Sequence, residues 1–120
     1  MLSVFLKAKL HHLTVTSSEL NYQGSLTLDL DFMEMVGMRP YEKILVANLE
    51  NGERFETYAI AGQRGSRTCC LNGATAHKGK IGDKVIVFSF CMLSDEELSS
   101  HQPKIAVFAE ENEVVRKSLI

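Results

Sequence analysis

Residues 84–92 read KVIVFSFCM, a nearly continuous apolar run. β-Branched and aromatic residues fill most of it, and such residues favour strands. The run is far shorter than the roughly 20 apolar residues that a membrane-spanning helix needs. We therefore predict a central strand that is covered on both faces.

Short apolar runs separated by turn residues continue this pattern in both directions along the chain. Asn51-Gly52 and Asn72-Gly73 mark turns that need a positive φ. The predicted strands span residues 4–6, 10–16, 25–30, 43–49, 54–61, 68–71, 84–92 and 104–109. Many short strands with few helical segments predict a mainly β domain, most economically a small closed barrel.

Two short helices are predicted between these strands. Asp31 is placed to cap a helix over residues 32–36, which Gly37 and Pro40 would end. Residues 94–97 read SDEE and have the Ser-x-x-Glu spacing of a capping box. The charged tail from Glu110 onward is predicted to fray.

Size and charge exclude several classes of function. The chain has 120 residues, enough for one domain, so a dinucleotide-binding domain beside a separate substrate domain does not fit. Thirteen Lys+Arg against 15 Asp+Glu give a net charge of −2, which argues against broad binding of nucleic acid. No membrane segment is expected, and Lys7 and Lys9 interrupt the apolar start, which argues against a secretory signal.

The three cysteines indicate a reducing compartment. Cys69, Cys70 and Cys91 form no C-x-x-C motif, so neither a zinc ribbon nor a redox pair is indicated. All three lie in apolar stretches, where a free cysteine usually acts as a small hydrophobic residue. We therefore expect buried thiols in a cytoplasmic protein.

The histidines do not predict a metal site. His11 and His12 are adjacent, and successive side chains of a strand point to opposite faces, so the two are not expected to share one ion. His77 and His101 show no ligand spacing either.

Residues 22–25 read YQGS and allow two interpretations. One is an ordinary turn that enters a strand. The other is chemical, because a serine hydroxyl can attack the preceding carbonyl when the loop is strained and the oxyanion is stabilised. Gly24 has no Cβ and can adopt backbone conformations that bring its carbonyl toward the Ser25 hydroxyl.

Two further segments each allow a purely structural and a functional interpretation. In residues 54–58, RFETY, strand alternation places Arg54 and Tyr58 on the same face. This is either a half-exposed strand with an ion pair, or an anion-binding guanidinium beside a proton-transferring phenol. Residues 72–76, NGATA, are either a tight turn or a backbone N–H cradle that a substrate can approach.

Seven segments follow one another along the chain: KLH (9–11), VT (15–16), YQGS (22–25), NGERFETY (51–58), RGS (64–66), NGA (72–74) and IGD (81–83). Taken in this order, they closely resemble the pyruvoyl-dependent aspartate decarboxylase family. The resemblance covers about residues 9 to 108. It implies a small closed six-stranded double-psi β-barrel with a few short helices.

The same resemblance implies a self-processing proenzyme made as a single domain, residues 1–120. Ser25 Oγ would attack the Gly24 carbonyl, and elimination would split the chain into residues 1–24 (the beta chain) and 25–120 (the alpha chain). A covalent pyruvoyl group would remain at position 25. Thr57 resembles the residue that assists this rearrangement by hydrogen bonding.

The implied reaction converts L-aspartate into β-alanine and CO2 for pantothenate and coenzyme A biosynthesis. The pyruvoyl carbonyl would form a Schiff base with the substrate amine and act as the electron sink, without pyridoxal phosphate or metal. Tyr58 is the implied proton donor. Arg54 is the best candidate for a carboxylate clamp, because its planar fork allows bidentate pairing, and Lys9 is a second cation.

Further positions follow from the resemblance alone. Thr57, Gly73, Ala74 and Thr75 match substrate-binding positions, although the family usually has alanine where this chain has Thr75. The supporting positions are His11, Tyr22 and Asn72. The resemblance also implies a homotetramer with sites at subunit interfaces, and some relatives need a separate maturation factor.

Two alternatives remain beside the enzyme. The first is a non-catalytic double-psi barrel that serves as a binding or interaction module, which would not need Gly24, Ser25, Thr57 and Tyr58 together. The second is a β-rich, transcription-factor-like dimer, against which the net charge and the lack of a basic stripe weigh.

Overall fold

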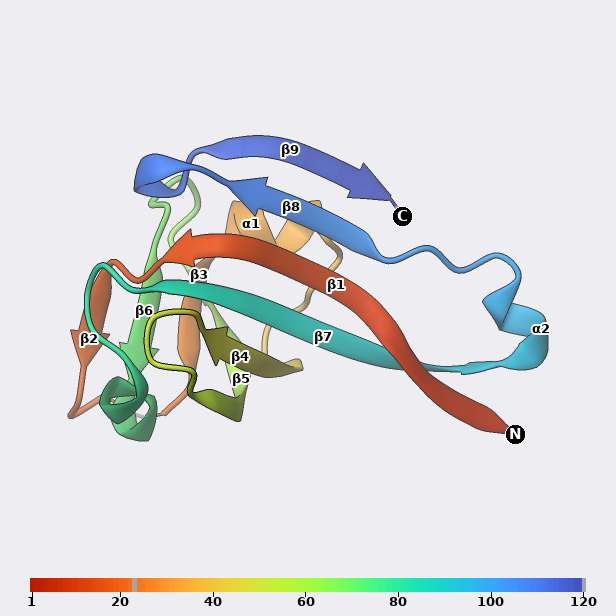
Figure 1. The fold of residues 1–120 in the computed structure, drawn as a ribbon, viewed down its shortest axis with the longest axis horizontal. Helices are drawn as coiled ribbons and strands as arrows, with labels where there is room; N and C mark the ends of the chain where they lie inside the picture. The colour runs from red at the N-terminus through yellow and green to blue at the C-terminus, as the bar shows by residue number, and fades with distance from the viewer. Residues whose placement is uncertain (23, 120) are drawn as a thin grey trace.

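Two long antiparallel strands, β1 (Leu2–Thr14) and β7 (Lys84–Ser94), run along the length of the molecule (Figure 1). The computed structural model describes residues 1–22 and 24–119. β7 also pairs with β4, which confirms its predicted central position. Its predicted cover on both faces is wrong, because burial alternates along β7 and its distal residues Phe90 and Met92 are 44% and 61% exposed.

Nine strands form one hydrogen-bonded ladder in the order β2-β6-β3-β5-β4-β7-β1-β8-β9. The remaining strands are β2 (Ser17–Glu19), β3 (Leu26–Asp29), β4 (Lys43–Asn48), β5 (Arg54–Gly62), β6 (Cys69–Asn72), β8 (Lys104–Phe108) and β9 (Val114–Leu119). The predicted mainly β fold with a few short helices is confirmed. The ladder of the described residues ends at β2 and β9, and its closure into a six-stranded double-psi barrel stays a prediction.

Three strands differ from the prediction. Residues 4–6 and 10–16 were expected as two strands, but β1 is continuous because β7 pairs with it on both sides of a register shift between Leu6 and Ala8. The expected fraying of the tail is wrong, since β9 pairs antiparallel with β8. β2 was not predicted, and it is held by parallel pairing with β6.

The helices are short and lie at the ends of strands. They are α1 (Leu30–Met35), α2 (Asp95–Leu98), and the 3-10 helices η1 (Gly73–Lys78) and η2 (Glu110–Asn112). Asp29 rather than Asp31 caps α1, because the Asp29 carboxylate accepts from the Asp31 N–H at 2.8 Å. The capping box of Ser94 and Glu97 is confirmed at α2. None of the helices in the described part of the chain is long and apolar enough to cross a membrane.

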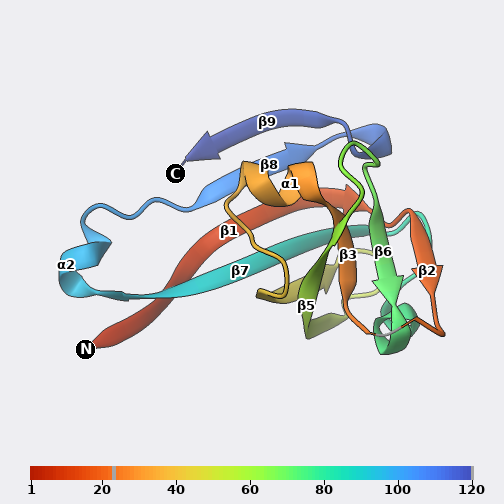
Figure 2. The same cartoon turned by 180° about the vertical axis from the view of Figure 1, so that it is seen from behind.

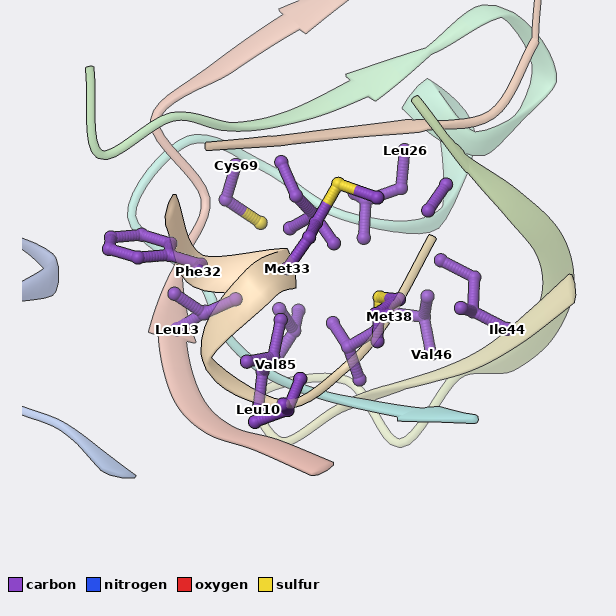
Figure 3. Packing of buried hydrophobic residues seen from close by; sticks show 14 of the residues in the cluster. Leu10, Leu13, Leu26, Phe32, Met33, Met38, Ile44, Val46, Cys69 and Val85 are labelled. Carbon is purple, nitrogen blue, oxygen red and sulfur yellow. The ribbon is translucent and has the colours of Figure 1, made fainter. Parts of the chain in front are cut away.

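One hydrophobic core lies beneath α1, inside the curved sheet (Figure 3). Met33 of α1 belongs to the same buried cluster as Leu10 of β1, Leu26 of β3 and Val46 of β4, and all four side chains are fully buried. Burial of a side chain of this size contributes about 1.5–3 kcal/mol. The core therefore fixes the start of β3. Figure 2 shows that this end of the sheet, beside η1, lies far from α2 and the N-terminus.

Candidate active site

The residue that precedes β3 lies between two neighbouring strands. β3 pairs in parallel with β5 and antiparallel with β6. This register places Ser25 level with Tyr58 of β5 on one side and Asn72 of β6 on the other. The Asn72 N–H donates to the Ser25 carbonyl oxygen at 3.0 Å, so the ladder extends one residue beyond β3.

Ser25 combines a strained backbone with a free hydroxyl. Its φ is +86°, a region that residues with a side chain rarely adopt and that costs about 1–3 kcal/mol. The residue is only 1% exposed, and Ser25 Oγ has no hydrogen-bond partner among the described residues. A buried, unpartnered hydroxyl is costly to stability, and it is available for chemistry.

Two glycines approach each other closely beside Ser25. A Cβ on Gly73 would lie 2.7 Å from the Gly24 nitrogen and 2.8 Å from the Tyr22 carbonyl oxygen, and the φ of Gly73 is +58°. A Cβ on Gly24 would lie 3.9 Å from the Tyr58 hydroxyl oxygen. The segment around Gly24 therefore rests directly on the start of η1, within reach of the Tyr58 phenol.

The Asn72 side chain is fixed at both ends. Its Nδ2 donates to Thr27 Oγ1 at 2.7 Å, and Cys70 Sγ donates to its Oδ1 at 3.2 Å. Sequence reasoning missed both Thr27 and Cys70. The signal was their spacing, because each lies two residues from Ser25 or Asn72 on the same strand and so shares its face.

Thr75 also contacts the chain around Ser25. Its Oγ1 lies 2.7 Å from the Asn72 carbonyl oxygen and 3.2 Å from the Ser25 carbonyl oxygen. The neighbouring Ala74 is exposed, whereas Thr75 is buried. We refer below to the Ser25 cluster, which comprises Tyr22, Gly24, Ser25, Tyr58, Asn72, Gly73 and Thr75.

Strand β5 shows the alternation that its sequence predicts. Arg54, Glu56 and Tyr58 are exposed, whereas Phe55 and Thr57 are half-buried on the other face. Tyr58 belongs to the Ser25 cluster because its phenol lies close to Gly24. The hydrogen bonds of the described residues include none from the Thr57 hydroxyl to Gly24 or Ser25, so the role of Thr57 in processing stays a prediction.

Lys9 and Arg54, the cation pair, flank one aromatic ring. Lys9 Nζ lies 5.7 Å from the centroid of the Phe88 ring, and Arg54 Cζ lies 5.9 Å from it. Phe88 pairs with Lys9 across β1 and β7, which explains their contact. Sequence reasoning missed Phe88, which it treated as part of an apolar strand. In the described part of the chain, no hydrogen bond or salt bridge joins the cation pair to the Ser25 cluster.

His11 and His12 do not point to opposite faces as predicted. Their rings stack with centroids 3.9 Å apart, because a register shift between Leu10 and Leu13 and a φ of +67° at His12 interrupt the alternation. Burial lowers the pKa of His11, and the positive charges of His12 and Lys9 lower it further. The described residues contain no group of three or more side chains able to hold a metal ion.

Comparison with known proteins identifies relatives along nearly the whole chain. Residues 1–115 match the family model described as aspartate decarboxylase. The aspartate 1-decarboxylase of Caldicellulosiruptor saccharolyticus is 50% identical over 118 residues, which are 98% of this chain and 92% of that protein. The corresponding enzyme of Leptospira biflexa is 49% identical, covering 98% of this chain and all of the relative. That of Bacillus subtilis is also 49% identical, covering 95% and 90% of the two chains.

Proposed function

Because this chain belongs to the aspartate decarboxylase family, we propose that it cuts itself at Gly24–Ser25 to make the group with which it decarboxylates L-aspartate. Decarboxylation of aspartate is the activity that its relatives carry in their names, and the chain is an enzyme of that type. The observation that supports the proposed route best is the buried, strained Ser25 with its unpartnered hydroxyl.

The proposed cleavage proceeds in three steps, namely ester formation, elimination and hydrolysis. Ser25 Oγ adds to the Gly24 carbonyl carbon and the peptide C–N bond breaks, which leaves an ester and a free amino group on residue 25. Loss of the Cα proton with cleavage of the Cβ–Oγ bond releases residues 1–24 with a terminal carboxylate. Water then replaces the nitrogen on residue 25 and ammonia leaves, so the larger fragment is residues 25–120.

The residues around position 25 fit a pyruvoyl group. Gly73 leaves the space that the Gly24 segment needs, and the Asn72 N–H holds the carbonyl of residue 25 from the neighbouring strand. When present, such a group supplies an electrophilic carbonyl that takes the substrate amine and accepts the electron pair left by loss of CO2. Thr57 is proposed to assist the cleavage by hydrogen bonding, as the family resemblance implies.

The Tyr58 phenol is the proposed proton donor to the carbon that loses CO2. Its oxygen lies 3.9 Å from the position that a Cβ on Gly24 would occupy, so it lies beside the residue that precedes the proposed cut. The side chain is 40% exposed, which leaves it open toward arriving substrate. A phenol can return a proton to a carbanion when it is held in reach.

The cation pair is the proposed binding site for the carboxylates of aspartate. Arg54 offers a planar fork for bidentate pairing, and Lys9 adds a second positive charge. The Phe88 ring lies within 6 Å of both cations, at 5.7 Å from Lys9 Nζ and 5.9 Å from Arg54 Cζ. We also assign Thr57, Gly73 and Ala74 to the substrate-binding region, with His11, Tyr22 and Asn72 in supporting positions. The family resemblance places Thr75 in the same region, but its hydroxyl contacts the carbonyl oxygens of Ser25 and Asn72, which favours a different role for it.

A homotetramer with sites between subunits is the proposed assembly. No hydrogen bond or salt bridge of the described residues joins the cation pair to the Ser25 cluster of the same chain, and in the proposed assembly the cation pair of one copy serves the Ser25 cluster of its neighbour. The outer parts of β1 and β7 carry exposed apolar side chains, namely Leu2, Val4, Phe90 and Met92. Contiguous apolar surface of this kind is typical of interfaces.

The proposed metabolic role is to supply β-alanine for pantothenate and coenzyme A. We place the reaction in the cytoplasm, which the three free cysteines support. A separate maturation factor is a further proposed partner. Intact-mass measurement of the purified protein, with and without added cell extract, tests self-cleavage and the need for such a factor together.

A further inference from the structure

The Thr75 hydroxyl lies between two backbone carbonyls of the Ser25 cluster. Oγ1 is 3.2 Å from the carbonyl oxygen of Ser25 and 2.7 Å from that of Asn72. Thr75 is 8% exposed, so bulk water does not compete for these contacts. A hydroxyl carries a single proton, so the two carbonyls share one donor.

The Ser25 carbonyl is thereby held from two directions. The Asn72 N–H approaches it at 3.0 Å along the sheet ladder, and Thr75 Oγ1 approaches from the first turn of η1. Both contacts lie on the carbonyl side of residue 25. They therefore remain possible when the bond on the amino side, to Gly24, is cut.

We propose that Thr75 is a positioning residue for residue 25. This inference rests on the proposed function and deepens it, because it assigns the Thr75 hydroxyl to the chain's own carbonyl rather than to aspartate. Before cleavage, the hydroxyl helps to maintain the strained φ of +86° from which Ser25 Oγ must react. After cleavage, residue 25 is a chain end, and the same hydrogen bond orients it.

The Thr75 hydroxyl proton, which the two carbonyls share, can stabilise negative charge on the carbonyl oxygen of residue 25. A hydrogen bond to an oxygen that gains negative charge is stronger than one to a neutral carbonyl. When charge builds on the carbonyl oxygen of residue 25, the Thr75 proton therefore turns toward it and away from Asn72. Because the Asn72 N–H still donates to this carbonyl, loss of the Thr75 hydroxyl slows chain cleavage and decarboxylation without abolishing either.

Two substitutions of Thr75 separate the hydroxyl from the bulk of the side chain. Thr75→Val keeps the volume and removes the donor, whereas Thr75→Ser keeps the donor. Thr68→Val is the matched control, because Thr68 lies at the other end of β3, where its carbonyl accepts from the Asp29 N–H. Thr75→Ala is a second variant without the hydroxyl, for use if circular dichroism shows that Thr75→Val does not fold.

The first readout is the time course of chain cleavage by intact mass. Loss of one hydrogen bond predicts a half-time about 3- to 10-fold longer for Thr75→Val. Thr75→Ser and Thr68→Val should stay within about twofold of the parent, since neither loses that bond. Cleavage of Thr75→Val and Thr75→Ala at the parental rate would overturn the inference, as would a Thr75→Ser variant as slow as Thr75→Val.

The second readout uses fully cleaved protein. We expect kcat for aspartate to fall in Thr75→Val with KM unchanged, because the hydroxyl touches residue 25 and not the substrate. Phenylhydrazine reacts with the ketone of the pyruvoyl group at position 25, and the product can be followed by its absorbance. We expect this reaction to slow in Thr75→Val in parallel with kcat. A rise in KM alone would instead make Thr75 a substrate contact and contradict the assignment. A parent chain that never cleaves would refute the proposed function itself, which is a distinguishable failure.

Discussion

The backbone N–H of Asn72 donates a hydrogen bond to the carbonyl oxygen of Ser25 at 3.0 Å. This contact continues the pairing of β3 with β6 to Ser25, one residue before the start of β3. The residue with the unpartnered hydroxyl is thus part of the sheet rather than of a free loop. We therefore expect cleavage at Ser25 to depend on the close contact between Gly73 and the Gly24 segment, and to depend little on substitutions in distant turns.

Gly73→Ala should strongly slow cleavage of the chain at Gly24–Ser25. The new Cβ would meet the Gly24 nitrogen at 2.7 Å and the Tyr22 carbonyl oxygen at 2.8 Å, so the Gly24 segment must move. We expect the cleavage rate to fall at least tenfold, since a misplacement of about 1 Å can reduce a rate 100-fold. Gly52→Ala is the control, because Gly52 also has a positive φ, +76°, but open space around it. Equal cleavage rates in the two variants would contradict the proposed role of this contact.

Tyr58→Phe should separate cleavage from decarboxylation. The ring and its packing remain, so two fragments should form, but the proposed proton donor is gone. General acid catalysis typically contributes about 100-fold or more, and we expect kcat to fall by that order. Tyr41→Phe is the control, since Tyr41 lies with its ring centroid 6.4 Å from that of Tyr58 and is 76% exposed. Unchanged turnover of Tyr58→Phe would remove the phenol from the mechanism.

Mixed assemblies test whether each site uses two subunits. Arg54→Gln chains should cleave themselves but bind aspartate poorly, and Ser25→Ala chains should keep the cation pair but never cleave. Co-expression should restore activity, to about one quarter of the wild-type level if subunits mix at random around a symmetric assembly. Mixed oligomers, verified by native mass spectrometry, that show no recovered activity would place both groups in the same chain.

The Lys7–Glu42 pair should make stability depend on pH. Burial by itself would raise the pKa of Glu42, but hydrogen bonds from Lys7 Nζ at 2.7 Å and from the Arg39 N–H lower it below its ordinary value of 4.5. A lowered pKa in the folded state means that the stabilisation is present above pH 4.5 and is lost as the pH falls through the folded value.

Glu42→Gln should therefore reduce the free energy of unfolding by about 1–2 kcal/mol at neutral pH. The difference from wild type should shrink below pH 4.5, as measured by urea unfolding across a pH series. Glu56→Gln is the control, because the Lys43–Glu56 pair is exposed and spans 3.5 Å. A difference for Glu42→Gln that persists at low pH would show that its effect is not electrostatic.

Local patterns predicted the elements that short-range rules govern. The capping box at Ser94, the alternation of β5 and the central position of β7 all follow from spacing along the chain. The missed features depend on long-range pairing. β9 forms because β8 offers an edge, and the stacked ring of His12 depends on where β1 shifts against β7.

The same distinction holds for the site. Resemblance indicated Ser25, Tyr58 and Asn72, and the register of β3 brings these three side by side. Thr27 and Cys70 were missed, because their spacing only places them on the same face as Ser25 and Asn72, whereas their hydrogen bonds to the Asn72 amide depend on the pairing of β3 with β6. No local pattern indicates that Lys9 and Arg54 meet at Phe88, since that contact depends on the pairing of β7 with β1 and with β4.

The mass of the purified chain tests the central claim most directly. Self-cleavage predicts two fragments, residues 1–24 and residues 25–120, with the larger one lighter by one ammonia than a fragment that begins with serine. Ser25→Ala, prepared in parallel, should give a single uncut chain. A wild-type chain that stays intact after prolonged incubation, even with cell extract, would contradict the claim that Ser25 is the source of the reactive group.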